Sequence, residues 1–194
     1  MRKLTIDDIA DLRAYERERE EFRSHIIGLK RRRRIQLGDL LTITFENTDT
    51  MRFQIQEMAR AEKMLTDAAI EHEVATYNEL IPDSGELSGT LFVELTSDDL
   101  LREWLPKLVG IQRAISFDVG GATSPAIPED EERLTREDIT STVHYLKFRF
   151  TPEQQAAFAA HEGIVRIVVD HPEYRAAVEL SDDQRRELAR DFAE

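Results

Sequence analysis

Five polar side chains lie close together in one short segment of the first third of the chain. They are Arg52, Gln54, Gln56, Glu57 and Arg60. Guanidinium and carboxamide groups can hold an anion through several hydrogen bonds at once, and a nearby carboxylate can orient them. These five residues therefore form the candidate ligand-binding set.

The segment that carries these side chains has the periodicity of a helix. Apolar residues recur at intervals of three and four from Ile55 to Ala69, which predicts one long helix that continues to about residue 77. Thr48, Asp49 and Thr50 are the candidate N-cap residues, because short oxygen-bearing side chains accept hydrogen bonds from the free amides of a first helical turn.

The position of Arg52 in the first turn calls for a negative partner, because a cation there opposes the helix dipole by ~0.3–1 kcal/mol. The favoured interpretation is structural, with Asp49 or Glu57 as the partner. The alternative is an anionic or carboxylate-bearing ligand held by Arg52, Gln56, Arg60 and the helix amides.

Other kinds of chemistry find little support in the residue spacing. The five histidines are scattered, and neither Glu21 with His25 nor the run 71–73 has the ligand spacing of a zinc hydrolase or a di-iron bundle. No serine lies in a Gly-x-Ser-x-Gly motif, and cysteine is absent. The sequence therefore predicts no catalytic residue, no metal site and no cofactor, and it leaves open whether the protein is an enzyme.

Two features precede the candidate set. A heptad-like apolar stripe from Leu12 to Leu29 predicts a long N-terminal helix. We expect it to pack on another helix of the same chain, with a homodimer seam as the alternative. The basic run 30–34 follows, and we interpret it as a helix C-terminus, where cations offset the dipole, in preference to a nucleic-acid or lipid contact.

Strand patterns occur at 40–45, 90–95 and 114–119, and again at 143–150, 164–170 and 174–180. Between these two groups, residues 120–133 combine paired glycines, two prolines and an acidic run, which is typical of a linker or long loop. We therefore divide the chain into 1–119, the linker 120–133 and a β-α-β-β-α part, 134–194, within one or two domains. The expected fold class is α+β, with a mixed and largely antiparallel sheet faced by helices.

The composition restricts the partners. A net charge of −13 opposes binding to nucleic acid and to anionic membranes. There is no apolar run of membrane-spanning length and no signal-peptide pattern at the N-terminus, so we expect a cytoplasmic protein.

The residues 45–58 also resemble the most distinctive segment of an uncharacterised bacterial family, known as a domain of unknown function. The segments 2–9 and 91–96 and the pair His171–Pro172 fit the same family, so the resemblance spans the chain. It implies a setting in which such proteins are encoded beside rubrerythrin-like proteins and iron–sulfur oxidoreductase subunits. It implies no activity and transfers no functional residue.

Two functions follow as hypotheses. The first is a non-enzymatic accessory or regulatory protein of a redox or oxidative-stress system, whose partner is a rubrerythrin-like or iron–sulfur protein by resemblance. The second is a small-molecule binding protein or enzyme with its site around Arg52, Gln56, Glu57 and Arg60. A concave pocket that gathers these side chains would favour the second hypothesis.

Overall fold

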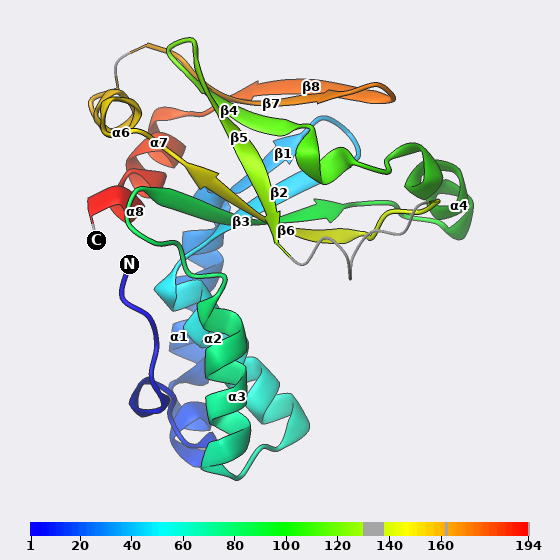
Figure 1. The fold of residues 1–194 in the computed structure, drawn as a ribbon. Coiled ribbons are helices and arrows are strands. Elements are labelled where there is room, and N and C mark those ends of the chain that lie inside the picture. Colours follow the sequence, from blue (N-terminus) through cyan, green and yellow to red (C-terminus); the bar gives the residue numbers. More distant parts are fainter. Residues whose placement is uncertain (130–137, 162, 194) are drawn as a thin grey trace.

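Segments with alternating apolar residues form the strands of one antiparallel sheet (Figure 1). The computed structural model describes residues 1–129, 138–161 and 163–193. Its strands follow the order β1-β2-β3-β6-β5-β4-β7-β8, and every pairing among the described strands is antiparallel. The strands are β1 (Arg34–Leu37), β2 (Leu41–Glu46), β3 (Glu86–Val93), β4 (Ile115–Val119), β5 (Ala122–Glu129), β6 (Val143–Arg149), β7 (Val165–His171) and β8 (Tyr174–Glu179). The α+β class is confirmed.

The sheet curls around an aromatic core. Phe117 is fully buried and lies 5.0 Å from the ring of Phe148 and 5.2 Å from that of Phe150. In Figure 1, β7 and β8 lie above β1 and β2, and residues of both pairs of strands belong to one apolar cluster. This arrangement lets the two edge strands, β1 and β8, approach each other.

A tyrosine joins these two edges. The hydroxyl of Tyr174, the first residue of β8, donates to the carbonyl of Leu37 at 2.7 Å and accepts from the amide of Leu40 at 3.1 Å. Gly38 lies in the turn between β1 and β2 with φ = 72°, and a Cβ atom there would collide with the same hydroxyl. A glycine at this position is therefore required both by the backbone conformation and by the close approach of Tyr174.

The predicted linker is wrong where the structure describes it. Residues 122–129 form β5, which pairs first with β4 and then, from Ala126 on, with β6. Because each half of β5 is paired on one side only, Pro125 and Pro128 remove no hydrogen bond that the sheet needs. One sheet therefore contains strands from both of the predicted parts, and residues 130–133 of the expected linker lie outside the described residues.

The second correction concerns the long helix after β2, which consists of α2 (Thr48–Glu62) and α3 (Asp67–Asn78). Lys63 adopts a left-handed conformation with φ = 53° and ends α2, and Thr66 caps α3. The N-cap of α2 is Asn47, which forms a capping box with Thr50. The observed cap therefore lies one residue before Thr48, the earliest of the three predicted candidates.

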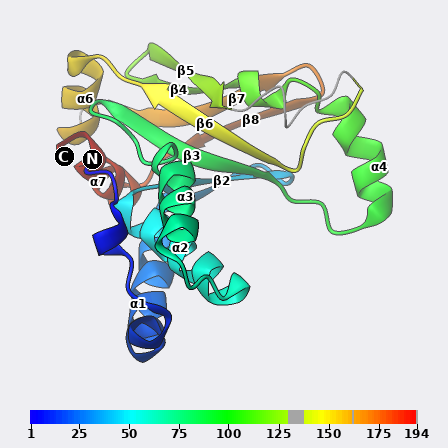
Figure 2. The same cartoon turned by 60° about the horizontal axis from the view of Figure 1, so that its bottom comes forward.

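These two helices and α1 (Leu12–Arg33) form an arm that projects from one face of the sheet (Figures 1 and 2). The long N-terminal helix is thus confirmed, and it packs on α2 of the same chain, as expected. A short 3-10 helix, η1 (Ile6–Asp8), precedes α1, and a small cluster around Leu4, Ile55 and Val74 fills the inside of the arm.

The remaining helices lie at the ends of the sheet (Figure 1). They are α4 (Asp98–Lys107), η2 (Ile111–Arg113), α6 (Pro152–Ala159), α7 (Asp182–Leu188) and α8 (Arg190–Ala193). The β-α-β-β-α order of the C-terminal part is confirmed, with α6 starting at the Thr151 capping box and Pro152 as predicted. No helix in the part of the chain that the structure describes has the length and apolar character needed to cross a membrane.

The basic run anchors the arm to the rest of the molecule. Arg33 is completely buried and donates to the carbonyls of Phe45 and Glu46 at 2.9 and 3.2 Å. Its guanidinium also pairs with Asp191 of α8 and Glu187 of α7. This residue of the run has a structural role, because it ties the C-terminal end of α1 to the sheet and to the last two helices.

Candidate functional site

The predicted ligand-binding set is divided between two environments in the structure. Glu57 faces α1, where Arg19 donates to both of its carboxylate oxygens at 2.7 and 2.8 Å and the hydroxyl of Tyr15 donates at 2.7 Å. The hydrogen bonds from Arg19 are the main reason that the pKa of Glu57 is lowered to about 2. Burial raises the pKa of Tyr15, and its hydrogen bond to Glu57 adds to this effect.

Gln56 and Arg52 hold the N-terminal segment against α2. Gln56 is completely buried, accepts from the amide of Ala10 at 2.7 Å and donates to its carbonyl at 3.1 Å. Arg52 donates to the carbonyl of Asp8 at 2.9 Å and lies 4.9 Å from the ring centre of Phe22. Both side chains therefore have protein partners from other elements.

The two arginines pair with α1. The guanidinium of Arg52 lies 3.4 Å from the carboxylate of Glu18, and Arg60 pairs with Glu16. These partners differ from Asp49 and Glu57, which the helical spacing suggested. The difference arises because α1 lies alongside α2 and presents its own acids, a packing that local spacing does not reveal.

Arg52 also borders an open hollow of about 360 Å³ between α1 and α2. The other residues that line this hollow are Glu18, Glu21, Phe22 and His25. Two carboxylates so close to one guanidinium oppose the binding of an anion there. Among the residues of the predicted set, only Gln54 faces a different and more enclosed cavity.

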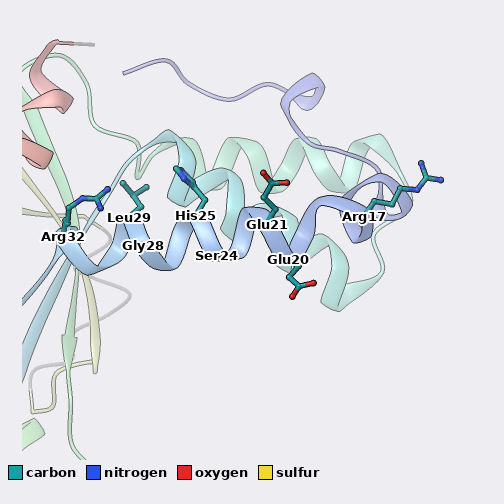
Figure 3. Close-up of a pocket in the computed structure, with 8 residues that line it drawn as sticks. All are labelled: Arg17, Glu20, Glu21, Ser24, His25, Gly28, Leu29 and Arg32. Carbon is teal, nitrogen blue, oxygen red and sulfur yellow. The ribbon is translucent and has the colours of Figure 1, made fainter.

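A wider hollow, of about 800 Å³, lies along α1 (Figure 3). Its lining residues are Arg17, Glu20, Glu21, Ser24, His25, Gly28, Leu29 and Arg32, and all of them belong to that one helix. A Cβ atom added at Gly28 would meet nothing within 4 Å. A hollow that only one helix lines is an open surface, and it does not have the enclosing walls of a ligand site.

A cavity of about 290 Å³ lies where the arm meets the sheet, and we name it the Glu46 cavity. It is formed by one residue of α1, side chains of α2 and α3 with Leu80 just beyond, and the outer face of β2, β3 and β6. The lining residues are Lys30, Glu46, Met51, Gln54, Tyr77, Leu80, Thr90, Phe92, Val143 and Tyr145. Aromatic and apolar walls with a few polar groups are the usual composition of a small-molecule site.

Glu46 is the polar group at the base of this cavity. It is only 4% exposed, and its Oε1 accepts from the hydroxyl of Thr90 at 2.9 Å. Its Oε2 is buried and has no hydrogen-bond partner among the described residues. The backbone cannot move away from the cavity, because Arg33 binds the Glu46 carbonyl and the next residue, Asn47, caps α2.

Besides Glu46 and Thr90, four polar side chains contribute to the lining: Lys30, Gln54, Tyr77 and Tyr145. Lys30 comes from the end of α1 and forms no ion pair within 4.0 Å among the residues that the structure describes. Burial raises the pKa of Tyr77, while a hydrogen bond from Gln54 acts in the opposite direction. The cavity thus contains one carboxylate, one ammonium group and two phenols around an apolar wall.

The sequence pattern conceals Glu46. It alternates with Ile43 and Phe45 at the end of a strand, which is the usual pattern of a residue that faces solvent. Thr42 and Thr44 on the same outer face are buried too, because the arm covers this side of the sheet. Only the three-dimensional packing of the arm shows that Glu46 is enclosed.

No described group of three or more histidine and acidic side chains is arranged to hold a metal ion. The side chains that line the Glu46 cavity offer hydrogen bonds and charge. Its carboxylate can accept from a ligand donor, and the phenols and Lys30 can donate to a ligand acceptor.

The fold and the cavity together define a class: an α+β protein with a curled antiparallel sheet, a three-helix arm and a partly open cavity with polar and apolar walls where the two meet. Within that class, the chain belongs to the family described as protein of unknown function DUF3501, whose model matches residues 3–192. The domain-of-unknown-function assignment made from the sequence is therefore confirmed.

A solved structure shares both fold and sequence with this chain. It is the crystal structure of a novel protein of unknown function from Burkholderia pseudomallei K96243, with 32% sequence identity and a TM-score of 0.90. The similarity covers 98% of this chain and all of the other. No curated protein matches the chain.

Proposed function

We propose that the protein binds a small molecule in the Glu46 cavity, and that this molecule presents a hydrogen-bond donor, best a protonated amine, to the carboxylate of Glu46. The observation that carries the proposal is the buried carboxylate oxygen without a partner. A buried polar atom without a hydrogen bond costs ~1–3 kcal/mol, and a charged one costs more. A protein tolerates this cost to its stability most readily at a binding site, where the ligand supplies the missing hydrogen bond.

The size and walls of the cavity agree with this function. Its volume of about 290 Å³ is close to the lower end of the ~300–1,000 Å³ range of ligand pockets. Tyr77, Tyr145 and Phe92 provide aromatic surface, on which a small amine can bury its apolar part. The proposal keeps Gln54 of the predicted set in the site and gives Arg52, Gln56, Glu57 and Arg60 the structural role described above.

The first prediction concerns Glu46→Gln. This variant keeps an acceptor for Thr90 and removes the charge, so we expect the unfolding free energy of the ligand-free protein to rise by ~1–2 kcal/mol. Phenethylamine should raise the melting temperature of the wild type and leave that of the variant unchanged, while phenethyl alcohol should affect neither. Thermal melts with each compound measure both effects.

Glu86→Gln is the matched control. Glu86 is also buried, at 6% exposure, but it already accepts from Arg149 at 2.7 Å and lies outside the cavity. This variant should keep the response to the amine and should not be more stable than the wild type. A destabilised Glu46→Gln, or an equal rise in the melting temperature of both variants with phenethylamine, would show that Glu46 is an ordinary structural residue.

The accessory role implied by the resemblance is a second and separate proposal, with a cytoplasmic location and a rubrerythrin-like or iron–sulfur protein as partner. The net charge of −13 supports it, because a strongly acidic surface favours docking on a basic one. A pull-down from the native host at low and high salt tests it. Recovery of such a partner that salt weakens is the expected result, and its absence at both salt concentrations contradicts the proposal.

A further inference from the structure

The Glu46 cavity contains two opposite charges that do not meet. Glu46 stands at the end of β2 and Lys30 near the end of α1, and both line the same 290 Å³ space. No ion pair within 4.0 Å joins them, although salt bridges are frequent elsewhere in the described chain. A ligand that carries both a positive and a negative group can therefore pair with Glu46 and Lys30 at once.

The remaining walls describe the body of such a ligand. Met51, Leu80, Phe92 and Val143 are apolar, and the rings of Tyr77 and Tyr145 add aromatic surface with a hydroxyl at one end. A hydrocarbon or aromatic group therefore fits between the two charged side chains better than a second polar group does.

From this arrangement we infer that the ligand is a small zwitterion of the amino-acid class, with a protonated amine on Glu46, a carboxylate on Lys30 and an apolar body between or beside them. This inference rests on the proposed function and adds the carboxylate to it. It also relates the cavity to the carboxylate-bearing ligand that was the alternative interpretation of the sequence, with Lys30 in place of Arg52 as the cation.

A simpler interpretation assigns Lys30 a different role. Its long side chain can rotate into the cavity and neutralise Glu46 directly, and the cavity would then need no ligand. The two interpretations differ in what happens when Lys30 is removed. If Lys30 binds the ligand carboxylate, its removal abolishes the preference for carboxylate-bearing ligands. If Lys30 is instead the counter-ion of Glu46, its removal leaves a site that binds amines more tightly.

The test uses two sets of compounds that differ only in the second charge. One set is phenylalanine, phenylalaninamide and phenethylamine; the other is δ-aminovaleric acid, its amide and pentylamine, which place the two charges farther apart. Titration calorimetry measures their affinities for the wild type, Lys30→Met and Lys30→Gln. Arg31→Met is the control, because Arg31 is the exposed neighbour on the same helix and its loss changes the net charge equally.

We expect the wild type and Arg31→Met to bind the acid of at least one set about tenfold or more tightly than its amide, as one charge-assisted hydrogen bond allows. Both Lys30 variants should reduce this preference to within about twofold and keep the affinity for the amine. Thermal melts confirm that each variant is folded. Two different substitutions of Lys30 are used so that one remains if the other does not fold.

Results that would contradict the zwitterion inference can be distinguished from results that would contradict the proposed function. Amine binding by the wild type without any preference for the acid overturns the zwitterion inference and leaves the proposed function intact. Tighter binding of amines by Lys30→Met overturns it as well, because it identifies Lys30 as the internal counter-ion. If no compound of either set binds, while Glu46→Gln is more stable than the wild type, the zwitterion inference fails and a donor of another class remains to be found.

Discussion

Glu46, which is buried, and Glu57, whose side chain is 27% exposed, lie eleven positions apart in sequence and differ in how many hydrogen-bond donors surround the carboxylate. Both oxygens of Glu57 accept hydrogen bonds, two from Arg19 and one from Tyr15. One oxygen of Glu46 accepts from Thr90, and the other has no partner among the described residues. The first carboxylate stabilises the arm, whereas the second keeps a buried oxygen without a donor, at a cost to the fold.

This difference gives a prediction for the dependence of stability on pH. The pKa of Glu57 in the folded protein is about 2, below its ordinary value of 4.5, so its stabilising contribution is complete above pH 4.5 and is lost as the pH falls toward 2. We expect Glu57→Gln to be less stable than the wild type at pH 6, and the difference to narrow below pH 4.5. Chemical denaturation at several pH values measures it.

The matched control for Glu57 is Glu79→Gln, a substitution of an exposed acid at the end of α3. Its difference from the wild type should stay small across the same pH range. A constant gap between the wild type and Glu57→Gln from pH 6 to pH 3 would show that the ion pair with Arg19 does not stabilise the fold.

At this scale the sequence predicts which residues are unusual but not what they contact. The position of Arg52 near a helix N-terminus indicates that something must pair with it, and both Arg52 and Gln56 do have partners. The partners are more than 30 residues away, Asp8 and Glu18 for Arg52 and Ala10 for Gln56. Spacing within one helix carries no information about such distant partners.

At the scale of elements, β5 shows how a strand can have the composition of a linker. Gly120 and Gly121 have φ values of 59° and 92°, and they join Val119 to its partner Ala122. Two central residues with positive φ make a type I′ turn, which suits the twist of a hairpin. The glycines are thus a hairpin signal, and the prolines are tolerated because β5 changes partners halfway along; neither fact can be seen without the neighbouring strands.

This turn gives a prediction that separates backbone conformation from packing. A Cβ atom at Gly120 would meet nothing within 4 Å, so any cost of a substitution comes from φ alone. Gly120→Val should lower the unfolding free energy by ~1–2 kcal/mol, because a β-branched residue resists the left-handed region. Gly120→Asn should stay within ~0.5 kcal/mol of the wild type, because asparagine tolerates that region.

Urea denaturation of both Gly120 variants measures the difference. Equal stability of the valine and asparagine variants would mean that residues 120 and 121 form a loose connection, as the composition suggested, and not a fixed turn.

At the scale of the whole molecule, the shape depends on how the edges of the sheet are joined. The order of the strands could not be predicted from the sequence, because it depends on pairings such as β3 with β6 and β4 with β7 that lie far apart along the chain. The residues that face the core were easier to predict, since alternation alone places Phe148 and Ile167 inside. The hydroxyl of Tyr174 then connects the first strand of the sheet to the last.

We expect Tyr174→Phe to lower the unfolding free energy by ~1–3 kcal/mol, because the Leu37 carbonyl and the Leu40 amide both lose their partner. Hydrogen exchange at the amide of Leu40 should become faster, and this readout is specific to the edge. Gly38→Ala should also destabilise the protein, and less so in the Tyr174→Phe background, where the colliding hydroxyl is gone.

Unchanged exchange at Leu40 in Tyr174→Phe would mean that the edges of the sheet stay together without this hydrogen bond. Strict additivity of the Gly38 and Tyr174 substitutions would mean that the cost of a Cβ atom at position 38 does not come from the Tyr174 hydroxyl.

The anchoring of Arg33 also sets an order of events during synthesis. Asp191, whose carboxylate pairs with this buried guanidinium, lies 158 residues later in the chain. At ~5–20 residues per second, a ribosome makes that stretch in about 8–30 s. Throughout this interval the finished α1 and β2 carry an arginine that cannot yet be buried at low cost. The base of the Glu46 cavity, which Arg33 fixes through a backbone carbonyl, is therefore among the last parts of the molecule to become rigid on the nascent chain.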